Sequence, residues 1–177
     1  MTPALKRHAA APSIDIQVAS PLWDAQPLAE QTVRDAIAAA ASALSTTDGE
    51  VSILLTDNKA IRTLNREWRK IDKATNVLSF PAAIAGGGEK MLGDEKMFGD
   101  IVIAYETLAQ ECDDEDRIFL HHLAHLTVHG FLHLVGYDHQ TDSNADEMEK
   151  LESKIMRAMN MPDPYLGRDL GRDIGEA

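Results

Sequence analysis

Histidines crowd one short stretch of this chain, and their spacing indicates a metal-binding helix. Six of the seven histidines lie between His121 and His139, and four of them recur at every fourth position: His121, His125, His129 and His133. Residues four apart share one face of an α-helix. A neutral imidazole is a frequent zinc ligand at about 2.0–2.1 Å, and two of them one turn apart can bind the same ion. We therefore expect a metal site here, against the plainer alternative of a histidine-rich helix surface.

The third metal ligand is best supplied from beyond the end of that helix. His125 is a poor choice beside His129 and His133, because ligands eight residues apart lie about 12 Å apart along a straight helix. Gly136 allows the chain to turn back, so that His139 can approach the other two imidazoles. Three protein ligands and one open coordination position describe a catalytic zinc site rather than a structural one. We predict one zinc ion per chain on His129, His133 and His139, although this ligand set does not exclude nickel or copper.

Gly130 distinguishes this pattern from the motif of a zinc protease, which has similar histidine spacing. In those enzymes a glutamate at this position is the general base for the attacking water. Glycine cannot accept a proton, so the protease interpretation loses its main chemical support while the metal site remains. The other histidines of the cluster either contact the ligand rings or are ordinary core and surface residues.

A second cluster of functional interest is a basic stripe at helical spacing, formed by Lys59, Arg62, Arg66, Arg69 and Lys73. Residues 59–73 contain six basic and two acidic residues, so the segment carries +4 while the rest of the chain carries −16. A local basic patch in an acidic chain favours an anionic substrate such as RNA, and the stripe is our predicted RNA-binding surface. The alternative is a solvated helix face without a function. Apolar residues out of phase with the stripe are predicted to form its buried face: Ile61, Leu64, Trp68 and Ile71.

The bulk composition is that of one globular domain. The chain has 177 residues, of which 44% are hydrophobic and 26% charged, and a net charge of −12 that opposes non-specific binding to nucleic acid. No apolar run approaches the ~20 residues of a membrane span, and the N-terminal residues lack the apolar core of a signal peptide, so we expect the cytoplasm. A single cysteine, Cys112, rules out an internal disulfide and a cysteine-built zinc cage. We expect a flexible N-terminus over residues 1–12, a metallohydrolase domain over 13–160 and a frayed tail over 161–177.

The helices and strands that must position these side chains can be predicted from the sequence. Their pattern predicts an α+β fold, with a small mixed four-stranded sheet packed with helices. Alternating or continuous apolar runs predict strands at residues 14–20, 50–56, 76–80 and 99–104. Helices are predicted at 27–44, from 58 onward with Asp57 as the N-cap, at 114–135 ending near Gly136, and at 143–159. Residues 82–98 contain four glycines and are predicted to form a mobile loop.

The segment HGFLHLVGYDH (129–139) resembles the signature of the bacterial YbeY family of single-strand-specific, metal-dependent endoribonucleases. Similar pieces follow the family order over roughly residues 50–160: LNREWRKIDKATNVLSFP (64–81), GDIVI (99–103) and MEKLE (148–152). The resemblance implies a compact α+β fold with the metal at one end of a cleft, zinc on the three histidines and a functional arginine that matches Arg69. It further implies a role in maturing the 3′ end of 16S rRNA and in ribosome quality control, with the small ribosomal subunit and ribosome-associated proteins as partners. The chain departs from the family at Asn76, where aspartate is common, and in its long glycine-rich loop.

These expectations combine into one mechanistic hypothesis and two alternatives. Arg69 and His129 are the predicted catalytic residues, the arginine to pair with the phosphate and the histidine as a metal ligand. No residue presents itself as the general base, and Asp138 lies where it can orient a ligand instead. The alternatives are a zinc-dependent hydrolase of small molecules or peptides, in which the basic stripe is incidental, and a non-catalytic ribosome-assembly factor with structural zinc.

Overall fold

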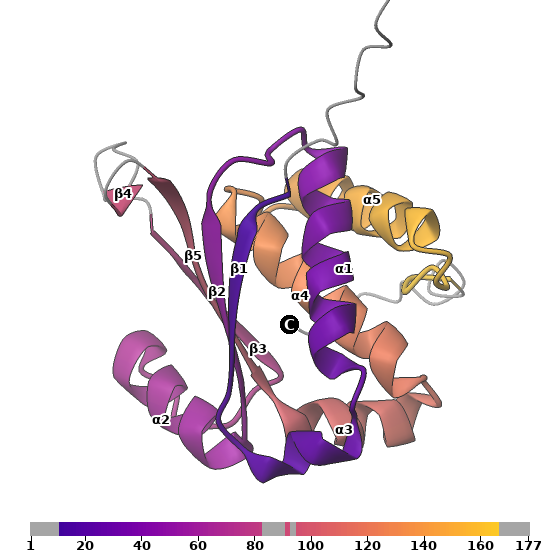
Figure 1. Ribbon diagram of the computed structural model, residues 1–177. Coiled ribbons are helices and arrows are strands. Elements are labelled where there is room, and N and C mark those ends of the chain that lie inside the picture. The colour runs from indigo at the N-terminus through magenta and orange to yellow at the C-terminus, as the bar shows by residue number, and fades with distance from the viewer. Residues whose placement is uncertain (1–10, 83–90, 93–94, 167–177) are drawn as a thin grey trace, which may run out of the picture.

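A mixed β-sheet forms the centre of the computed structural model, which describes residues 11–82, 91–92 and 95–166 (Figure 1). Its strands are β1 (Ser13–Val18), β2 (Glu50–Thr56), β5 (Glu95–Ala104) and β3 (Val77–Pro81), in the order β1-β2-β5-β3. β1 and β5 both run parallel to β2, and β3 pairs antiparallel with β5 as the edge strand. The prediction of an α+β fold around a mixed four-stranded sheet is confirmed.

The predicted loop over residues 82–98 is partly wrong. Residues 91–92 form a short strand, β4 (Met91–Leu92), which pairs with the start of β5, and β5 already begins at residue 95. The four glycines of this segment favour a loop in the sequence pattern, and the strand residues among them show little hydrophobic alternation. Residues 83–90 and 93–94, which carry the remainder of that prediction, lie outside the described part of the chain.

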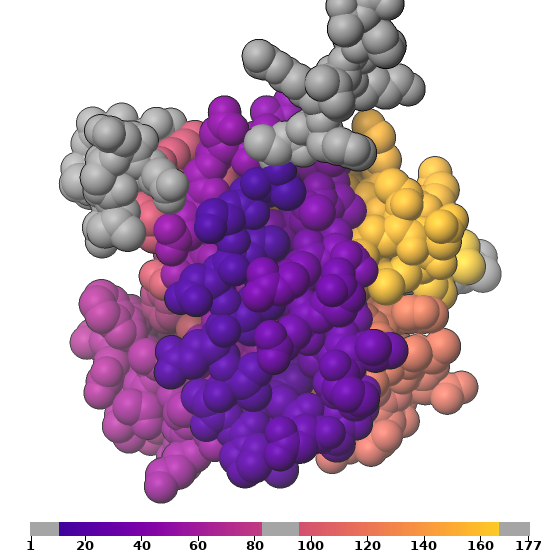
Figure 2. Space-filling view, viewed as in Figure 1, coloured from indigo at the N-terminus to yellow at the C-terminus, as the bar shows by residue number. Residues whose placement is uncertain are grey.

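In the described part of the chain, α-helices lie on both faces of the sheet and at one end of it. α1 (Ala29–Ala43), α4 (Phe119–Leu134) and α5 (Asp142–Ala158) lie on one side, α2 (Asn58–Arg69) lies on the other, and α3 (Tyr105–Glu115) lies at one end (Figure 1). A short 3-10 helix, η1 (Pro21–Ala25), precedes α1, which begins two residues later than predicted. Figure 2 shows α1 and β1 adjacent on one surface, where the Arg34 side chain donates to the Ile14 carbonyl at 3.1 Å.

Alternation along each strand explains the two cores. In β2, Val51, Ile53 and Leu55 join the larger core beneath α1 and α4, whereas Leu54 points to the opposite face. On that opposite face Ile61 of α2 packs in a smaller core. Because apolar side chains cover both faces of its central strands, the sheet holds the C-terminal ends of α2 and α4 on opposite sides of the edge strand β3. The space beside that edge is where the histidines and Arg69, at the end of α2, lie close together.

The helix predicted over 114–135 begins too early: its first residues belong to the end of α3, a helix that was not predicted from the sequence, and the rest contains α4. α3 ends at Glu115, Asp116 adopts a left-handed conformation with φ 52°, and α4 begins only at Phe119. Aspartate tolerates this conformation better than most residues, so the chain bends without a glycine or proline to mark the place. The acidic residues 114–116, which lie at the start of the predicted helix, therefore end the preceding helix.

α2 also ends earlier than the basic stripe requires. Asp57 caps its start as predicted, accepting from the Ala60 amide at 2.9 Å. The helix stops at Arg69 because Lys70 is left-handed, with φ 62°, and the buried Asn65 side chain donates to the Lys73 carbonyl at 2.8 Å. Lys73 therefore lies on the returning loop instead of the helical stripe.

The described part of the chain includes only a few residues of the two segments that were expected to be flexible, 1–12 and 161–177. Residues 1–10 of the expected flexible N-terminus and residues 167–177 of the expected tail lie outside the described part. Within the described part, Asp163 accepts from the Ser153 hydroxyl at 2.8 Å, which ties residues 161–166 to α5. None of the described helices combines the length and apolar character that a membrane crossing requires.

Candidate active site

Three histidine side chains converge at the C-terminal end of α4. His129 and His133 lie one turn apart, with their Nε2 atoms 3.1 Å from each other. His139 joins them from the loop after the helix, and one ligand atom from each of the three lies within 4.8 Å of the others. His129 and His133 are half-buried and His139 is exposed, so the cluster opens to solvent on one side. This group can hold a metal ion.

The turn that brings in His139 also orients His133. Gly136 has φ +103°, a backbone conformation that other residues rarely adopt, and it ends the helix as predicted. The Tyr137 amide then donates to the Leu132 carbonyl at 3.0 Å, and the Tyr137 carbonyl accepts from Nδ1 of His133 at 2.9 Å. Helix termination and ligand orientation are thus achieved by the same loop.

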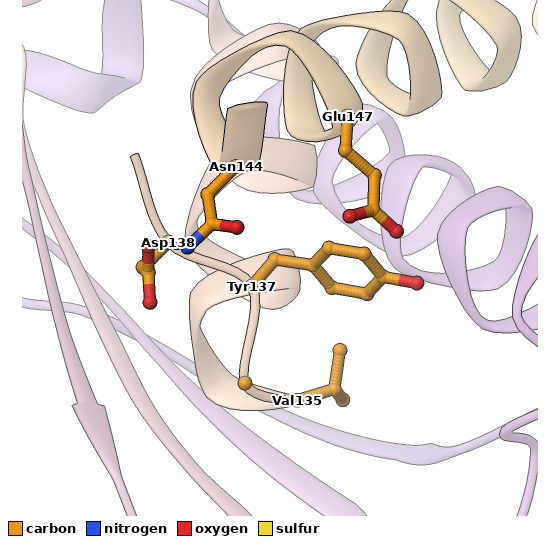
Figure 3. Close-up of a pocket in the computed structure, with 6 residues that line it drawn as sticks. Val135, Tyr137, Asp138, Asn144 and Glu147 are labelled. Atoms are coloured by element: carbon orange, nitrogen blue, oxygen red, sulfur yellow. Dashed lines mark hydrogen bonds between the residues drawn. The ribbon is translucent and has the colours of Figure 1, made fainter. Parts of the chain in front are cut away.

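Asp138 supports this loop from outside the cluster. Its Oδ1 accepts from the Gln140 amide at 3.2 Å and from the Asn144 side chain at 3.0 Å, which joins the loop to the first turn of α5. Figure 3 shows Asn144 reaching toward Asp138 above a small pocket that Tyr137 and Glu147 also line. These two hydrogen bonds lower the pKa of Asp138. The described contacts of Asp138 thus hold the loop that carries His139.

A fully buried carboxylate, Glu152 of α5, lies directly behind the cluster. Its Oε1 accepts from Nδ1 of His129 at 2.6 Å, and its Oε2 accepts from Nε2 of His125 at 2.9 Å and from the Tyr165 hydroxyl. Burial alone would raise the pKa of Glu152, but the hydrogen bonds from His125 and His129 outweigh it and lower the pKa to about 2. Glu152 is therefore an ionised acceptor at neutral pH.

The donor arrangement fits a bound cation. Carboxylate and carbonyl oxygens only accept, so the protons of His129 and His133 lie on their Nδ1 atoms, toward Glu152 and Tyr137. Both Nε2 atoms then carry lone pairs and face each other at 3.1 Å, which is repulsive unless a cation lies between them and His139. Burial, followed by the neighbouring His129 and His139, lowers the pKa of His133, so a proton is a poor substitute for a metal. Neutral imidazoles with outer hydrogen-bond acceptors are typical of metal-ligating histidines.

Arg69 shares a cleft with the three histidines. The cleft has a volume of about 640 Å³ and runs from the histidine cluster across the edge strand β3 to the last turn of α2, where Trp68 and Arg69 line it. The guanidinium group of Arg69 thus faces the same space as the three histidines. An anion bound at the histidines therefore lies near a guanidinium group.

The structure separates the remaining cations of the stripe from this cleft. Arg62 makes two hydrogen bonds to the Asp72 carboxylate, at 2.9 and 3.2 Å, and Arg66 lies 3.8 Å from the same group. The bond from Arg62 lowers the pKa of Asp72. Lys59 lies in the first turn of α2 and Lys73 on the loop after it. Of the five residues of the basic stripe, Arg69 is the one found among the described residues that line the cleft.

Gly130 lies where α4 comes closest to the sheet. A Cβ atom there would meet Cγ2 of Ile101 at 3.0 Å and Oγ of Ser79 at 3.2 Å, and the Ser79 hydroxyl donates to the Gly130 carbonyl at 3.1 Å. A side chain at this position therefore requires the Ile101 and Ser79 side chains to give way by a few tenths of an ångström. The packing at this position thus favours glycine over the glutamate of a zinc protease.

The other histidines of the cluster have separate environments. Nε2 of His122 lies 2.7 Å from Glu111, whose two carboxylate oxygens also accept from the Asn76 side chain at 3.1 Å. An aspartate at position 76 would face the Glu111 carboxylate, so asparagine suits this environment. His125 is almost fully buried against Glu152, and burial lowers the pKa of His125. His121 is half-buried and lines a different pocket.

Comparison with known proteins decides the family. A family model described as endoribonuclease YbeY matches residues 20–160, which contain the histidine cluster, Arg69 and Glu152. The chain belongs to the YbeY family. Proteins named endoribonuclease YbeY are similar to it over most of their length. One from Bradyrhizobium sp. (strain BTAi1) is 49% identical over 160 residues, which cover 89% of this chain and 95% of the relative. One from Nitrobacter winogradskyi is 51% identical over 160 residues, which cover 89% of this chain and 84% of the relative. A solution structure from Thermotoga maritima shares 20% identity with a TM-score of 0.44, covering 93% of this chain and 99% of that one.

Sequence reasoning about this YbeY-family chain missed Glu152 and Asp72. Glu152 lies in the MEKLE run, but its contact with His129 depends on how two consecutive helices, α4 and α5, pack against each other. One signal was available: Glu152 falls on the buried face of α5 with Met148 and Ile155, and a carboxylate on an apolar face needs partners. Asp72 gave no such signal, because its pairing with Arg62 depends on where α2 ends.

Proposed function

We propose that this YbeY-family protein is a zinc-dependent endoribonuclease that cleaves single-stranded RNA. The observation that carries the proposal is the shared cleft, in which three convergent histidines face Arg69. In this assignment His129, His133 and His139 hold one zinc ion, with His129 and Arg69 as the catalytic residues. Three neutral imidazoles and an open side suit zinc better than a hard cation such as Mg²⁺, which prefers oxygen ligands.

Each protein group has a defined task in phosphodiester hydrolysis. Zinc bound by three imidazoles supplies a Lewis acid that lowers the pKa of water to about 7. Glu152 holds the His129 ring with Nε2 directed into the cleft, and the Tyr137 carbonyl does the same for His133. Arg69 pairs with the phosphate and stabilises the charge that develops on its oxygens. Asp138 lines the same cleft, but its lowered pKa makes it a weak base and favours its role in holding the loop.

The biological setting of the proposal follows the family. We propose that the substrate is ribosomal RNA, that the reaction contributes to 16S rRNA 3′-end maturation and ribosome quality control, and that the protein acts in the cytoplasm with the small ribosomal subunit and its associated proteins. The net charge of −12 supports a partner that presents the RNA, because so acidic a chain gains little from general attraction to phosphates.

The deciding experiment combines RNA cleavage with metal binding. Purified protein is incubated with a labelled single-stranded RNA, with and without a chelator, beside the His133→Ala, Arg69→Ala and His121→Ala variants. We expect the chelator and His133→Ala to abolish cleavage and bound zinc together, and Arg69→Ala to reduce kcat by roughly 10²–10³-fold with zinc retained. His121→Ala, a histidine of the same helix that lies outside the cleft, is expected to behave as wild type.

Two results would contradict the proposal. Cleavage that persists in His133→Ala would place the activity elsewhere or in a contaminant. A zinc-loaded wild type that does not cut RNA, but unfolds when zinc is removed, would favour a structural metal and an assembly factor without catalysis.

A further inference from the structure

We propose that Trp68 is a stacking platform for an unpaired nucleobase of the RNA strand, placed beside the phosphate-binding Arg69. This inference rests on the proposed function and deepens it, because it names the residue that selects single strands. Trp68 lies next to Arg69 in the last turn of α2, and both side chains line the cleft that contains the histidines.

The exposure of Trp68 is the first observation. Its exposed fraction is 70%, although the helical pattern had predicted a buried position. Large aromatic side chains are usually mostly buried, and exposed ones often mark binding surfaces. The Trp68 ring makes an edge-type contact with Phe80 of β3, with centroids 6.0 Å apart and planes inclined at 62°. This contact restrains the indole while leaving much of its surface in solvent, so little mobility is lost when a ligand stacks on it.

The second observation is that Trp68 stands where two hollows meet. The cleft of about 640 Å³ at the histidines and a second groove of about 880 Å³ on the α2 side of the sheet are both lined by Trp68, Phe80 and Pro81. A chain bound at the histidines and continuing into the groove must pass over the tryptophan. The groove beyond is lined by apolar side chains that include Leu54 and Leu64.

The charges of the two hollows favour a nucleobase as the occupant of the second. Among the described residues that line the groove the charged ones are acidic, so it repels phosphate groups, whereas Arg69 attracts them in the cleft. Carboxylates, amides and hydroxyls can instead pair with the amino and carbonyl groups on base edges. The polar residues lining the groove are Asp15, Gln17, Ser52 and Asp100. The arrangement therefore separates a phosphate position at Arg69 from a base position at Trp68.

Stacking on Trp68 also accounts for selection of single strands. A base in a duplex is already stacked and paired, and it reaches an aromatic side chain only after extrusion from the helix. An unpaired base is free to lie on the indole, and such stacking tolerates any base identity because every base has a π-face. Trp68 thus favours single strands without imposing a strict sequence.

The test measures binding separately from cleavage. The zinc-loaded protein is titrated with a short 2′-O-methyl single-stranded RNA while tryptophan fluorescence is followed. The chain has two tryptophans, and Trp23 is buried in the core, where its indole N–H donates to the Thr56 carbonyl at 2.9 Å. Quenching should therefore come from Trp68 and be absent in Trp68→Phe. Trp68→Ala, Trp68→Tyr and Ile118→Ala, which truncates an exposed side chain of the segment before α4, are compared in the same assay and in RNA cleavage.

We expect Trp68→Ala to weaken single-strand binding and to raise KM by roughly 10- to 100-fold with kcat little changed. Trp68→Tyr should recover most of the affinity, Ile118→Ala should match wild type, and the preference for single strands over duplex should fall in Trp68→Ala alone. Unchanged affinity and KM in Trp68→Ala, in a protein that cleaves RNA, would overturn the inference and leave the proposed function intact. Quenching by the oligonucleotide without any cleavage would instead support the stacking platform and overturn the proposed function.

Discussion

At the scale of single residues, the candidate site depends on a charge that lies inside the protein. A fully buried carboxylate is costly unless it is paired and hydrogen-bonded. Glu152 meets this condition because His125 and His129 of α4 and the Tyr165 hydroxyl donate to it. Tyr165 lies outside residues 20–160, which the family model matches. Its position behind His129 gives the carboxylate a specific task, which is to hold the ring with Nε2 directed into the cleft.

Replacing Glu152 by glutamine should therefore weaken metal binding more than it alters the fold. Glutamine keeps the size of the side chain but removes the negative charge that strengthens the His129 ligand, and such losses typically cost about 10–100-fold in metal affinity. The measurement is zinc affinity by competition with a chromogenic chelator, together with the rise in Tm on adding zinc. Glu111→Gln is the matched control, because Glu111 pairs with His122 of the same helix away from the ligands. Equal losses of affinity in both variants would show that Glu152 has no special relation to the metal.

At the scale of elements, the site requires that α4 lie close against the sheet. Gly130 makes this possible at the point where the Ser79 hydroxyl donates to its carbonyl. The two ligands His129 and His133 lie on either side of this contact in sequence. The approach of the helix thus determines how far the ligands stand from β3 and from the cleft that β3 borders.

Gly130→Ala is accordingly expected to destabilise the protein by about 1–3 kcal/mol, because the new Cβ lies 3.0 Å from Cγ2 of Ile101 and 3.2 Å from Oγ of Ser79, and these packed side chains must give way. Urea unfolding at equilibrium measures this directly. Gly130→Glu, which would restore the protease-like base, should fail to fold instead of gaining peptidase activity. If Gly130→Ala unfolds at the wild-type urea concentration, α4 moves away without cost and the close contact is not required.

The same elements show which parts were predictable from sequence. The three candidate ligands lie within eleven residues, so helical spacing and one glycine were enough to suggest their convergence. Hydrophobic pattern is local as well, and it located β1, β2, β3 and the inner part of β5, but not β4 or the start of β5. The ends of α2 and α3 did not, because each ends at a non-glycine residue in a left-handed conformation, Lys70 and Asp116. Trp68 was assigned to a buried face because periodicity indicates which residues share a face, but not how far the neighbouring sheet extends to cover it.

At the scale of the whole molecule, the distribution of charge governs how the protein approaches RNA. The net charge of −12 repels a polyanion, and the structure pairs Arg62 and Arg66 with Asp72 outside the cleft. Exposed ion pairs of this kind contribute little to stability, but they reduce the local positive potential. The basic stripe that the sequence predicted is therefore weaker as a phosphate-binding surface than its count of cations suggests.

This difference can be measured in the salt dependence of binding. For single strands the logarithm of the affinity falls with the logarithm of salt concentration with a slope of about −0.7 for each phosphate that the protein neutralises. Arg69→Ala should make the slope shallower by about 0.7, because Arg69 lines the cleft, whereas Arg66→Ala should leave it nearly unchanged. Fluorescence anisotropy of a labelled single-stranded RNA over a series of KCl concentrations gives both slopes. Equal changes in the two variants would mean that phosphates follow the outer face of α2 and break the Asp72 pairs, and the path across Trp68 would then lose its electrostatic basis.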